Sequence, residues 1–140
     1  MPFIIDGDNL LGTWPGRRRS DADKRQLAMQ IARLAAAERK RFITVFDGTA
    51  PPGVAFGAGV RFAGCGRTAD DLILDTLKEQ EDRRGCVVVT SDRSLGDQCR
   101  YLEARVERCD RFRGRLRAAP ATEKPEHEDE IEFWLRQFGE

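Results

Sequence analysis

The sequence predicts an α/β fold, a three-layer α/β/α sandwich with a mostly parallel central sheet. Three short runs, at 3–5, 42–46 and 86–90, consist almost entirely of apolar or β-branched residues. Such runs are typical of strands buried on both faces. Longer helical patterns separate them, and strands that alternate with helices favour parallel pairing with helices on both faces of the sheet.

The first half of the chain begins with the strand at 3–5, which ends at Asp6 and is followed by a loop containing two glycines. Residues 21–41 are expected to form a helix, because apolar residues recur there at helical spacing and Ser20 or Asp21 can cap its start. The strand at 42–46 comes next.

The middle of the chain, residues 48–66, is rich in Gly and Pro, with one short predicted strand at 60–63. Thr68 is a natural N-cap for the next helix, with Asp71 at the third helical position in a capping-box arrangement. The later expected elements are a strand at 86–90, a helix at about 94–104 and a strand at about 105–109.

The last part of the sequence is predicted to hold a basic, then Pro/Ala-rich connection at 110–125 and an amphipathic helix at 126–138. All of residues 1–140 fit one domain. Residues 1–122 have a net charge of +5 and residues 123–140 of −5, so most of the chain is compatible with a polyanionic partner.

The composition is that of a globular protein. The chain is 40% hydrophobic and 34% charged, with no apolar run long enough to cross a membrane. The start lacks the basic segment and cleavage pattern of a signal peptide, so we expect a cytoplasmic protein without a membrane partner. The four cysteines form no CxxC pair and His127 is the only histidine, so we expect reduced, mostly buried thiols rather than a zinc site.

Aspartates follow the predicted strands at the points where they end. Asp6, Asp47 and Asp92 follow three strands, and Asp70 and Asp71 lie in the first turn of the helix after a fourth. In a parallel sheet these positions share one edge. Crowded carboxylates raise one another's pKa, because their negative charges repel. A bound Mg²⁺ or Mn²⁺ offsets this repulsion. The pattern therefore favours metal-assisted phosphoryl chemistry, with Asp6, Asp70 and Asp92 as the metal ligands.

Several neighbouring polar residues have a structural interpretation beside the functional one. They can be turn formers, helix caps, solvated loop acids or strand-end groups. They can equally bind a metal ion, a metal-bound water or a phosphate oxygen. The residues concerned are Asp8, Asn9, Asp47, Asp71, Thr90 and Ser91.

Two arginine clusters are candidates for RNA binding, because guanidinium groups suit phosphate contact. One comprises Arg17, Arg18 and Arg19, with Trp14 nearby as a possible base-stacking group. The other comprises Arg111, Arg113, Arg115 and Arg117, which alternate and would lie on one side of an extended segment. Solvated basic loops and ordinary packing of Trp14 are the alternatives.

Four motifs, in order, resemble the YacP-like branch of the NYN domains, within the PIN-like nuclease superfamily. They are IIDGDNLLGTWP, TVFDG, TADDLILDTL and VVVTSDRSL. The resemblance implies a PIN-like fold and a divalent-metal-dependent endoribonuclease that acts on RNA. It places family acids at Asp6, Asp70 and Asp92, the first-motif asparagine at Asn9 and a second acid at Asp71. The sequence departs from the family by having Asp8 where a tyrosine is usual.

Two other functions are compatible with parts of the sequence. DGDNLLGT resembles the start of a haloacid-dehalogenase-like phosphatase, which would use Asp6 as a nucleophile. That chemistry needs a later acidic pair, whereas Asp70 and Asp71 precede Thr90 here. The second alternative is a catalytically inert RNA-binding module, which the presence of all three key acids disfavours.

Overall fold

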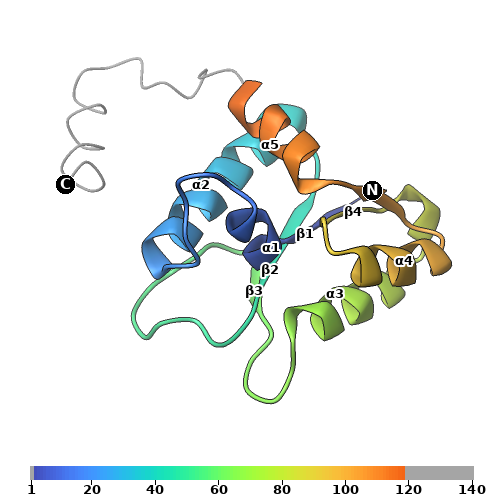
Figure 1. The fold of residues 1–140 in the computed structure, drawn as a ribbon, viewed down its shortest axis with the longest axis horizontal. Coiled ribbons are helices and arrows are strands. Elements are labelled where there is room, and N and C mark those ends of the chain that lie inside the picture. Colours follow the sequence, from blue (N-terminus) through green and yellow to red (C-terminus); the bar gives the residue numbers. More distant parts are fainter. Residues whose placement is uncertain (1, 119–140) are drawn as a thin grey trace.

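The computed structural model describes residues 2–118 and arranges their strands in one sheet (Figure 1). The strands are β1 (Phe3–Asp6), β2 (Phe42–Phe46), β3 (Val60–Phe62), β4 (Val87–Val89) and β5 (Arg105–Glu107). All neighbours pair in parallel, in the order β3-β2-β1-β4-β5. The chain moves outward from β1 to β3 and then returns to the other side of β1, so the switch point of the topology lies between β1 and β4.

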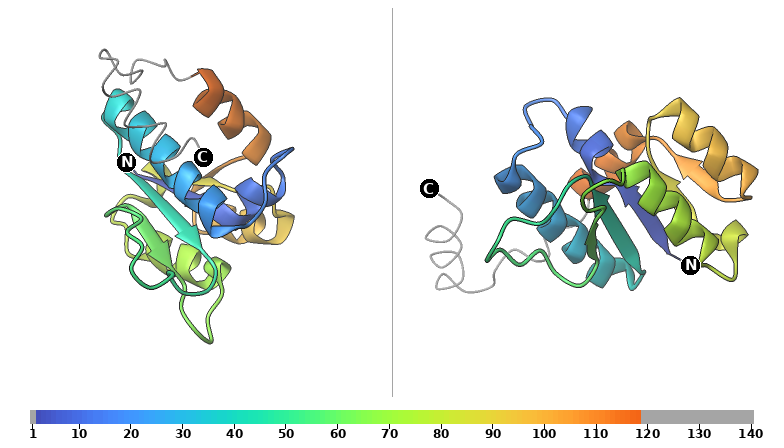
Figure 2. Two further views of the ribbon diagram at one scale, coloured as in Figure 1. Left: turned by 90° about the vertical axis from the view of Figure 1, so that its left-hand side faces the viewer. Right: turned by 90° about the horizontal axis from the view of Figure 1, so that it is seen from below.

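Helices cover both faces of this sheet (Figure 2). The helices are α1 (Gly7–Gly12), α2 (Asp21–Glu38), α3 (Ala69–Lys78), α4 (Arg93–Tyr101) and α5 (Cys109–Ala118), with a short 3₁₀ turn η1 (Arg83–Gly85). Side chains of α1, α2 and α5 share one core cluster, and those of α3 and α4 share the other. The predicted α/β sandwich is therefore confirmed.

The two cores explain why the strands are apolar throughout. In β1, Phe3 and Ile5 pack with α2 and α5, whereas Ile4 packs with α3 and α4. Successive residues of a strand point to opposite faces, so a strand covered on both sides needs apolar residues at every position. The same alternation in β2 and β4 places all three inner strands between the helical layers.

Two elements near the start differ from the sequence-based expectation. Residues 7–12 form the short helix α1 rather than a loop, with Asp6 as its N-cap. The helix α2 ends at Glu38, three residues before the expected end, because Arg39 takes a left-handed conformation with φ 54°. The amide of Lys40 then donates to the carbonyl of Ala35, which closes the helix and releases the chain toward β2.

The prediction of an irregular connection at 110–125 is wrong for its first part, because residues 109–118 form the helix α5. Cys109, Phe112 and Leu116 recur at helical spacing and are all buried in the core beside α2. Burial of this apolar stripe outweighs the intervening arginines. The rest of that connection and the helix expected at 126–138 lie outside the described residues.

The remaining expected elements are present with small shifts at their ends. Thr68 caps α3 in a capping box with Asp71, as predicted. Three of the four cysteines are buried, and Cys65 is exposed. Among residues 2–118, no helix has the length and apolar character needed to span a membrane.

Candidate active site

Aspartates from four segments lie at the carboxyl edge of the sheet. Asp6 is the last residue of β1 and Asp47 directly follows β2. Asp92 is the N-cap of α4, after β4, and Asp70 and Asp71 occupy the first turn of α3, after β3. The parallel pairing of all the strands puts these positions on one edge, near the topological switch point.

Asp6 is the most buried of these acids, at 4% exposed. Its carboxylate accepts hydrogen bonds from the Thr90 hydroxyl at 3.0 Å and from the backbone N–H of Asn9 at 3.4 Å. Burial, with smaller contributions from Asp70 and Asp8, raises the pKa of Asp6 to about 7, although the two hydrogen bonds oppose the shift. Ionisation of Asp6 therefore costs more free energy than ionisation of an exposed aspartate, and a bound cation nearby would reduce that cost.

Asp70 links the acids electrostatically. Partial burial raises the pKa of Asp70, and repulsion from Asp92, Asp47 and Asp71 adds to the effect. Asp70 in turn raises the pKa of Asp6. Carboxylates from β1, α3 and the start of α4 therefore act on one another across the edge of the sheet.

The donor chemistry of this edge suits a hard divalent cation, because its ligands would be carboxylate oxygens. Within residues 2–118, however, no three Asp, Glu, His or Cys side chains lie close enough together to enclose a metal ion. Among these residues the acids therefore do not form a closed cage of protein ligands. Mg²⁺ commonly binds through one or two carboxylates and keeps several waters, which fits such an edge.

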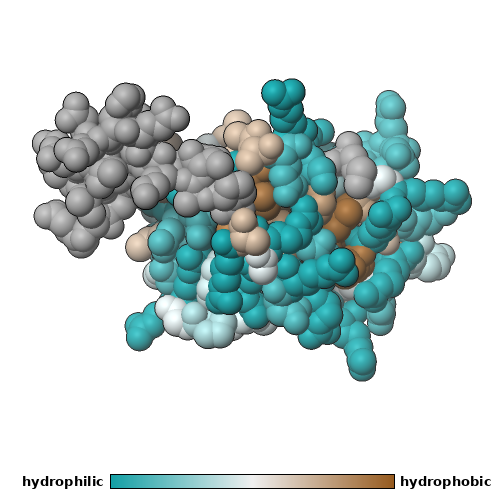
Figure 3. Space-filling view, turned by 90° about the horizontal axis from the view of Figure 1, so that it is seen from above, coloured by the Kyte–Doolittle hydropathy of each residue, from teal (hydrophilic) through white to brown (hydrophobic). Residues whose placement is uncertain are grey.

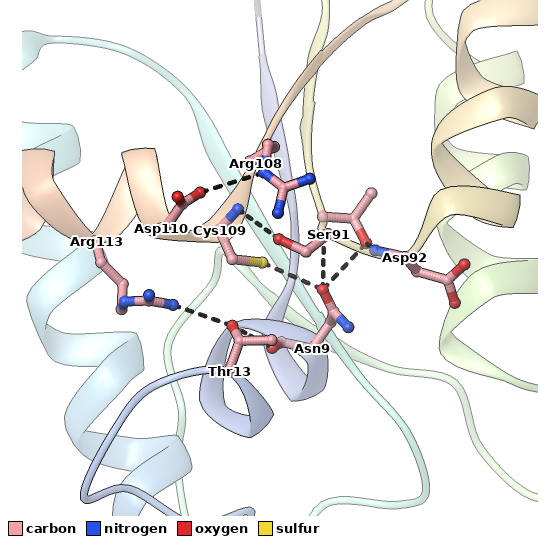
Figure 4. Close-up of polar contacts among 9 residues, drawn as sticks. Asn9, Thr13, Ser91, Asp92, Arg108, Cys109, Asp110 and Arg113 are labelled. Carbon is pink, nitrogen blue, oxygen red and sulfur yellow. Dashed lines mark hydrogen bonds and ion pairs between the residues drawn. The ribbon is translucent and has the colours of Figure 1, made fainter.

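Asn9, whose backbone N–H donates to Asp6, joins α1 to the end of β4 and to α5 (Figure 4). Its side-chain oxygen accepts from the Ser91 backbone N–H at 2.7 Å and lies 3.2 Å from the Cys109 sulfur and 3.4 Å from the Thr90 hydroxyl. The Ser91 hydroxyl accepts from the Cys109 N–H at 2.9 Å. Since its oxygen is occupied, the side-chain nitrogen of Asn9 points away from Ser91 and Cys109 (Figure 4).

The contact with Cys109 was not foreseen from the sequence, because an isolated cysteine far along the chain carries no pattern that relates it to Asn9.

Thr90 has two roles in the same network. Its hydroxyl lies within hydrogen-bonding distance of Asp6 and Asn9, and it also accepts from the Asp92 N–H at 3.1 Å. The network therefore holds the ends of β1 and β4 in a fixed relation.

Comparison with known proteins adds to this geometry. The family model of the YacP-like NYN domain matches residues 3–132. This chain belongs to the YacP-like NYN domain family. The membership confirms the resemblance drawn from the four motifs, and it points to a nuclease-like function related to RNA.

Solved structures of Rae1 (YacP) from Bacillus subtilis share the fold of this NYN domain. One is 18% identical with a TM-score of 0.71, and covers 98% of this chain and 80% of the Rae1 chain. A point mutant of Rae1 is 20% identical with a TM-score of 0.72, and covers 97% of this chain and 82% of that one. No curated protein matches the chain.

The secondary acidic candidates Asp8, Asp47 and Asp71 all have structural roles in the NYN domain. Asp8 is buried in α1, at 6% exposed, rather than solvated in a loop. Asp47 accepts a hydrogen bond from the backbone N–H of Ala69, at the start of α3. Asp71 accepts from the Thr68 N–H in the capping box. Each of these side chains therefore has a structural partner.

The first arginine cluster lies around Trp14, whose ring is only 7% exposed and belongs to the core. The Arg17 guanidinium lies 3.8 Å from the ring centre of Trp14, so of the two interpretations of this residue the structure favours ordinary packing over base stacking. Arg17 also donates to Gln30, and Arg19 donates to the carbonyl of Asp8. Arg18 remains exposed.

The second cluster is divided by the helical geometry of α5. The expectation that its four arginines share one side is wrong, because it assumed an extended segment. Arg115 contacts Glu38 at 3.0 Å and Glu107 at 3.2 Å, so it joins α5 to α2 and β5. Arg113 and Arg117, one helical turn apart, face the segment after α1, where Arg113 donates to the Thr13 hydroxyl.

Proposed function

We propose that this NYN domain is a divalent-metal-dependent endoribonuclease that hydrolyses RNA phosphodiester bonds at the aspartate edge. The observation that carries the proposal is that acids from separate elements lie at one edge of the parallel sheet: Asp6 ends β1, Asp92 caps α4 after β4, and Asp70 lies in the first turn of α3. The raised pKa of Asp6 and of Asp70 agrees with this crowding. Such crowding is costly in an isolated protein and useful where a cation binds.

Asp6, Asp70 and Asp92 are the residues that would hold Mg²⁺ or Mn²⁺: Asp6 and Asp92 directly, and Asp70 directly or through one of the waters of the ion. The bound ion would supply an activated water and would stabilise charge on the phosphodiester. The chain's own polar groups orient the site: Thr90 holds the Asp6 carboxylate, and the Asn9 oxygen is held by Ser91. The side-chain nitrogen of Asn9, which points away from Ser91 and Cys109, would donate to a phosphate oxygen.

The RNA-binding surface would lie between α1 and α5. Arg113 contacts Thr13, only four residues after Asn9, and the exposed Arg117 lies with its guanidinium 5.7 Å from the Trp14 ring. Together with Arg17, whose guanidinium lies 3.8 Å from the same ring, they gather positive charge around the segment that follows α1. The face on the side of α5 and α2 is largely hydrophilic (Figure 3). Phosphate contact at such a surface positions a strand without reading its sequence.

Arg115 and Arg117 provide a matched test of that surface. Arg117→Gln should weaken RNA binding and flatten its salt dependence, because one fewer counterion is released. Arg115→Gln should leave both nearly unchanged, since Arg115 is occupied by Glu38 and Glu107. Fluorescence anisotropy with one single-stranded RNA at several salt concentrations measures the difference. Equal effects of the two changes would remove α5 from the proposed RNA path.

The decisive test of the function is cleavage of labelled linear and circular RNA by the pure protein in Mg²⁺, Mn²⁺ or EDTA. Cleavage of the circle, which has no ends, identifies an endonuclease. Asp70→Asn should reduce cleavage about 100-fold, because a carboxylate that holds the ion directly or through a water loses its charge. Asp75→Asn, on the same helix but exposed and paired with Arg67, is the matched control.

The outcomes separate the competing functions. Activity that survives EDTA, or equal rates for Asp70→Asn and wild type in both metals, contradicts the proposed site. Release of phosphate from monoesters with no RNA cleavage would favour the phosphatase. RNA binding without cleavage of any RNA, and without Mn²⁺ binding, would favour the inert RNA-binding module.

A further inference from the structure

Asp8, which stands where the family usually has tyrosine, is a buried carboxylate with partners on two other segments. One oxygen accepts from the backbone N–H of Asp47 at 2.5 Å, and the other lies 3.7 Å from the ammonium of Lys24. A buried charge is costly unless it is both paired and hydrogen-bonded. Asp8 meets both conditions, so it ties α1 to α2 and to the end of β2.

The close approach of α1 to β2 depends on Gly7. A Cβ atom at this position would lie 2.4 Å from the ring of Phe46. Only glycine therefore lets the start of α1 lie directly against the end of β2. This approach brings the Asp8 carboxylate within hydrogen-bonding distance of Asp47, the residue after Phe46.

Asp47 continues the connection to α3. Its carboxylate accepts from the N–H of Ala69 at 2.6 Å. Ala69 is the first residue of α3, so its N–H has no partner within the helix. Thr68 and Asp71 hold the residues on either side through the capping box. The backbone that carries Asp70 is thus fixed immediately before and after that residue.

These contacts form a short path between two of the proposed metal ligands. Asp6 lies two residues before Asp8, and Asp70 directly follows Ala69. Two hydrogen bonds, from Asp47 N–H to Asp8 and from Ala69 N–H to Asp47, therefore join the segment of Asp6 to that of Asp70. The two proposed ligands repel each other, so their separation must be maintained by groups other than themselves.

We propose that Asp8 and Asp47 are positioning residues, whose hydrogen bonds to Asp47 N–H and Ala69 N–H set the place of Asp70 relative to Asp6. Lys24 neutralises Asp8, so that this carboxylate serves the backbone rather than a cation. The inference deepens the proposed function, on which its catalytic consequences rest. The positioning of α3 itself does not depend on that function.

Three changes and one control test the proposal. Asp47→Ala removes the acceptor for Ala69 N–H, whereas Asp47→Asn keeps a side-chain oxygen there. Asp8→Ala removes the acceptor for Asp47 N–H. The control is Asp82→Ala, which removes a comparable Asp contact, to the Gly85 N–H at 3.2 Å, beyond the C-terminal end of α3. Asp47 is exposed, so Asp47→Ala leaves no buried charge uncompensated and carries the test even if Asp8→Ala does not fold.

The first readout is hydrogen exchange of the Ala69 amide by NMR, without metal or RNA. Asp47→Ala and Asp8→Ala should accelerate it, Asp47→Asn should restore protection, and Asp82→Ala should leave it unchanged. The second readout is Mn²⁺ affinity by calorimetric titration, together with kcat and KM on one RNA. Asp47→Ala and Asp8→Ala should weaken Mn²⁺ binding and lower kcat by about 10- to 100-fold, with little change in KM.

Two results would overturn the proposal. One is unchanged exchange of the Ala69 amide in Asp47→Ala. The other is a loss of Mn²⁺ affinity and kcat no larger than that of Asp82→Ala, which would indicate a general loss of stability. If the wild type neither binds Mn²⁺ nor cleaves RNA, the proposed function fails, and the Ala69 exchange alone then decides whether Asp8 and Asp47 position α3.

Discussion

The strands β1 and β2 lie side by side and both lead into Asp-Gly, yet their aspartates have different environments. Asp6 is 4% exposed and its pKa is raised to about 7, chiefly by burial. Asp47 is exposed and accepts a hydrogen bond from the first N–H of α3. The same local motif therefore gives a buried carboxylate with a raised pKa in one place and a helix-capping group in the other.

The difference arises from the segment that comes after each dipeptide. After Asp6 the chain turns at once into α1, which covers the carboxylate, whereas after Asp47 it leaves the sheet in a long loop before β3 (Figure 1). The two glycines differ in the same way. Gly7 is required by its closeness to Phe46, while Gly48 has φ +77° and open space where a Cβ atom would lie. An Asp-Gly motif after a strand is thus no guide by itself to catalysis.

The largest expected difference between the two aspartates is in cleavage. Asp6→Asn should lower kcat/KM about 100-fold or more, because a proposed metal ligand loses its charge. Asp47→Asn should stay within a few-fold of wild type, since an amide oxygen can still accept from Ala69 N–H. The measurement is initial-rate cleavage of one RNA in Mn²⁺. Similar losses in the two variants would mean that both strand ends serve the metal.

The glycines should differ next, in stability. Gly7→Ala should lower the free energy of unfolding by about 3 kcal/mol, at the upper end for overpacking, because Phe46 is itself fully buried and cannot move aside. It should also impair cleavage by displacing α1. Gly48→Ala should cost about 1 to 2 kcal/mol for its left-handed backbone and leave cleavage intact. Urea unfolding and RNA cleavage of both variants test the contrast, which a normal cleavage rate for Gly7→Ala would break.

The smallest expected effect is the loss of the cap on α3. Asp47→Ala should lower the free energy of unfolding by about 1 kcal/mol, the usual cost of removing a side-chain partner from the first turn of a helix. Asp47→Asn should cost much less because it keeps the acceptor oxygen. Urea midpoints of the two variants give the difference. An equal loss in both would show that the negative charge, rather than the hydrogen bond, stabilises the start of α3.

Much of the fold could be predicted from local pattern. The three inner strands are apolar because both of their faces are covered, and Thr68 with Asp71 has the spacing of a capping box. The helix α5 was missed even though Cys109, Phe112 and Leu116 have helical spacing. Four arginines make that segment strongly basic, so its three apolar residues do not stand out as a helical pattern. These apolar residues stabilise the helix only by packing on α2 and the sheet.

The sequence by itself determined the five strands and the helices α2, α3 and α4 in their order along the chain, and it placed aspartates at the ends of strands that share one edge. Only the tertiary structure decided which of these carboxylates is buried and which caps a helix, because the partners are far apart in the chain. Asp8 meets Asp47 across 39 residues, and Arg115 meets Glu38 across 77. Neither contact has a periodicity that reveals it, since burial and charge pairing depend on which segments the folded sheet brings together.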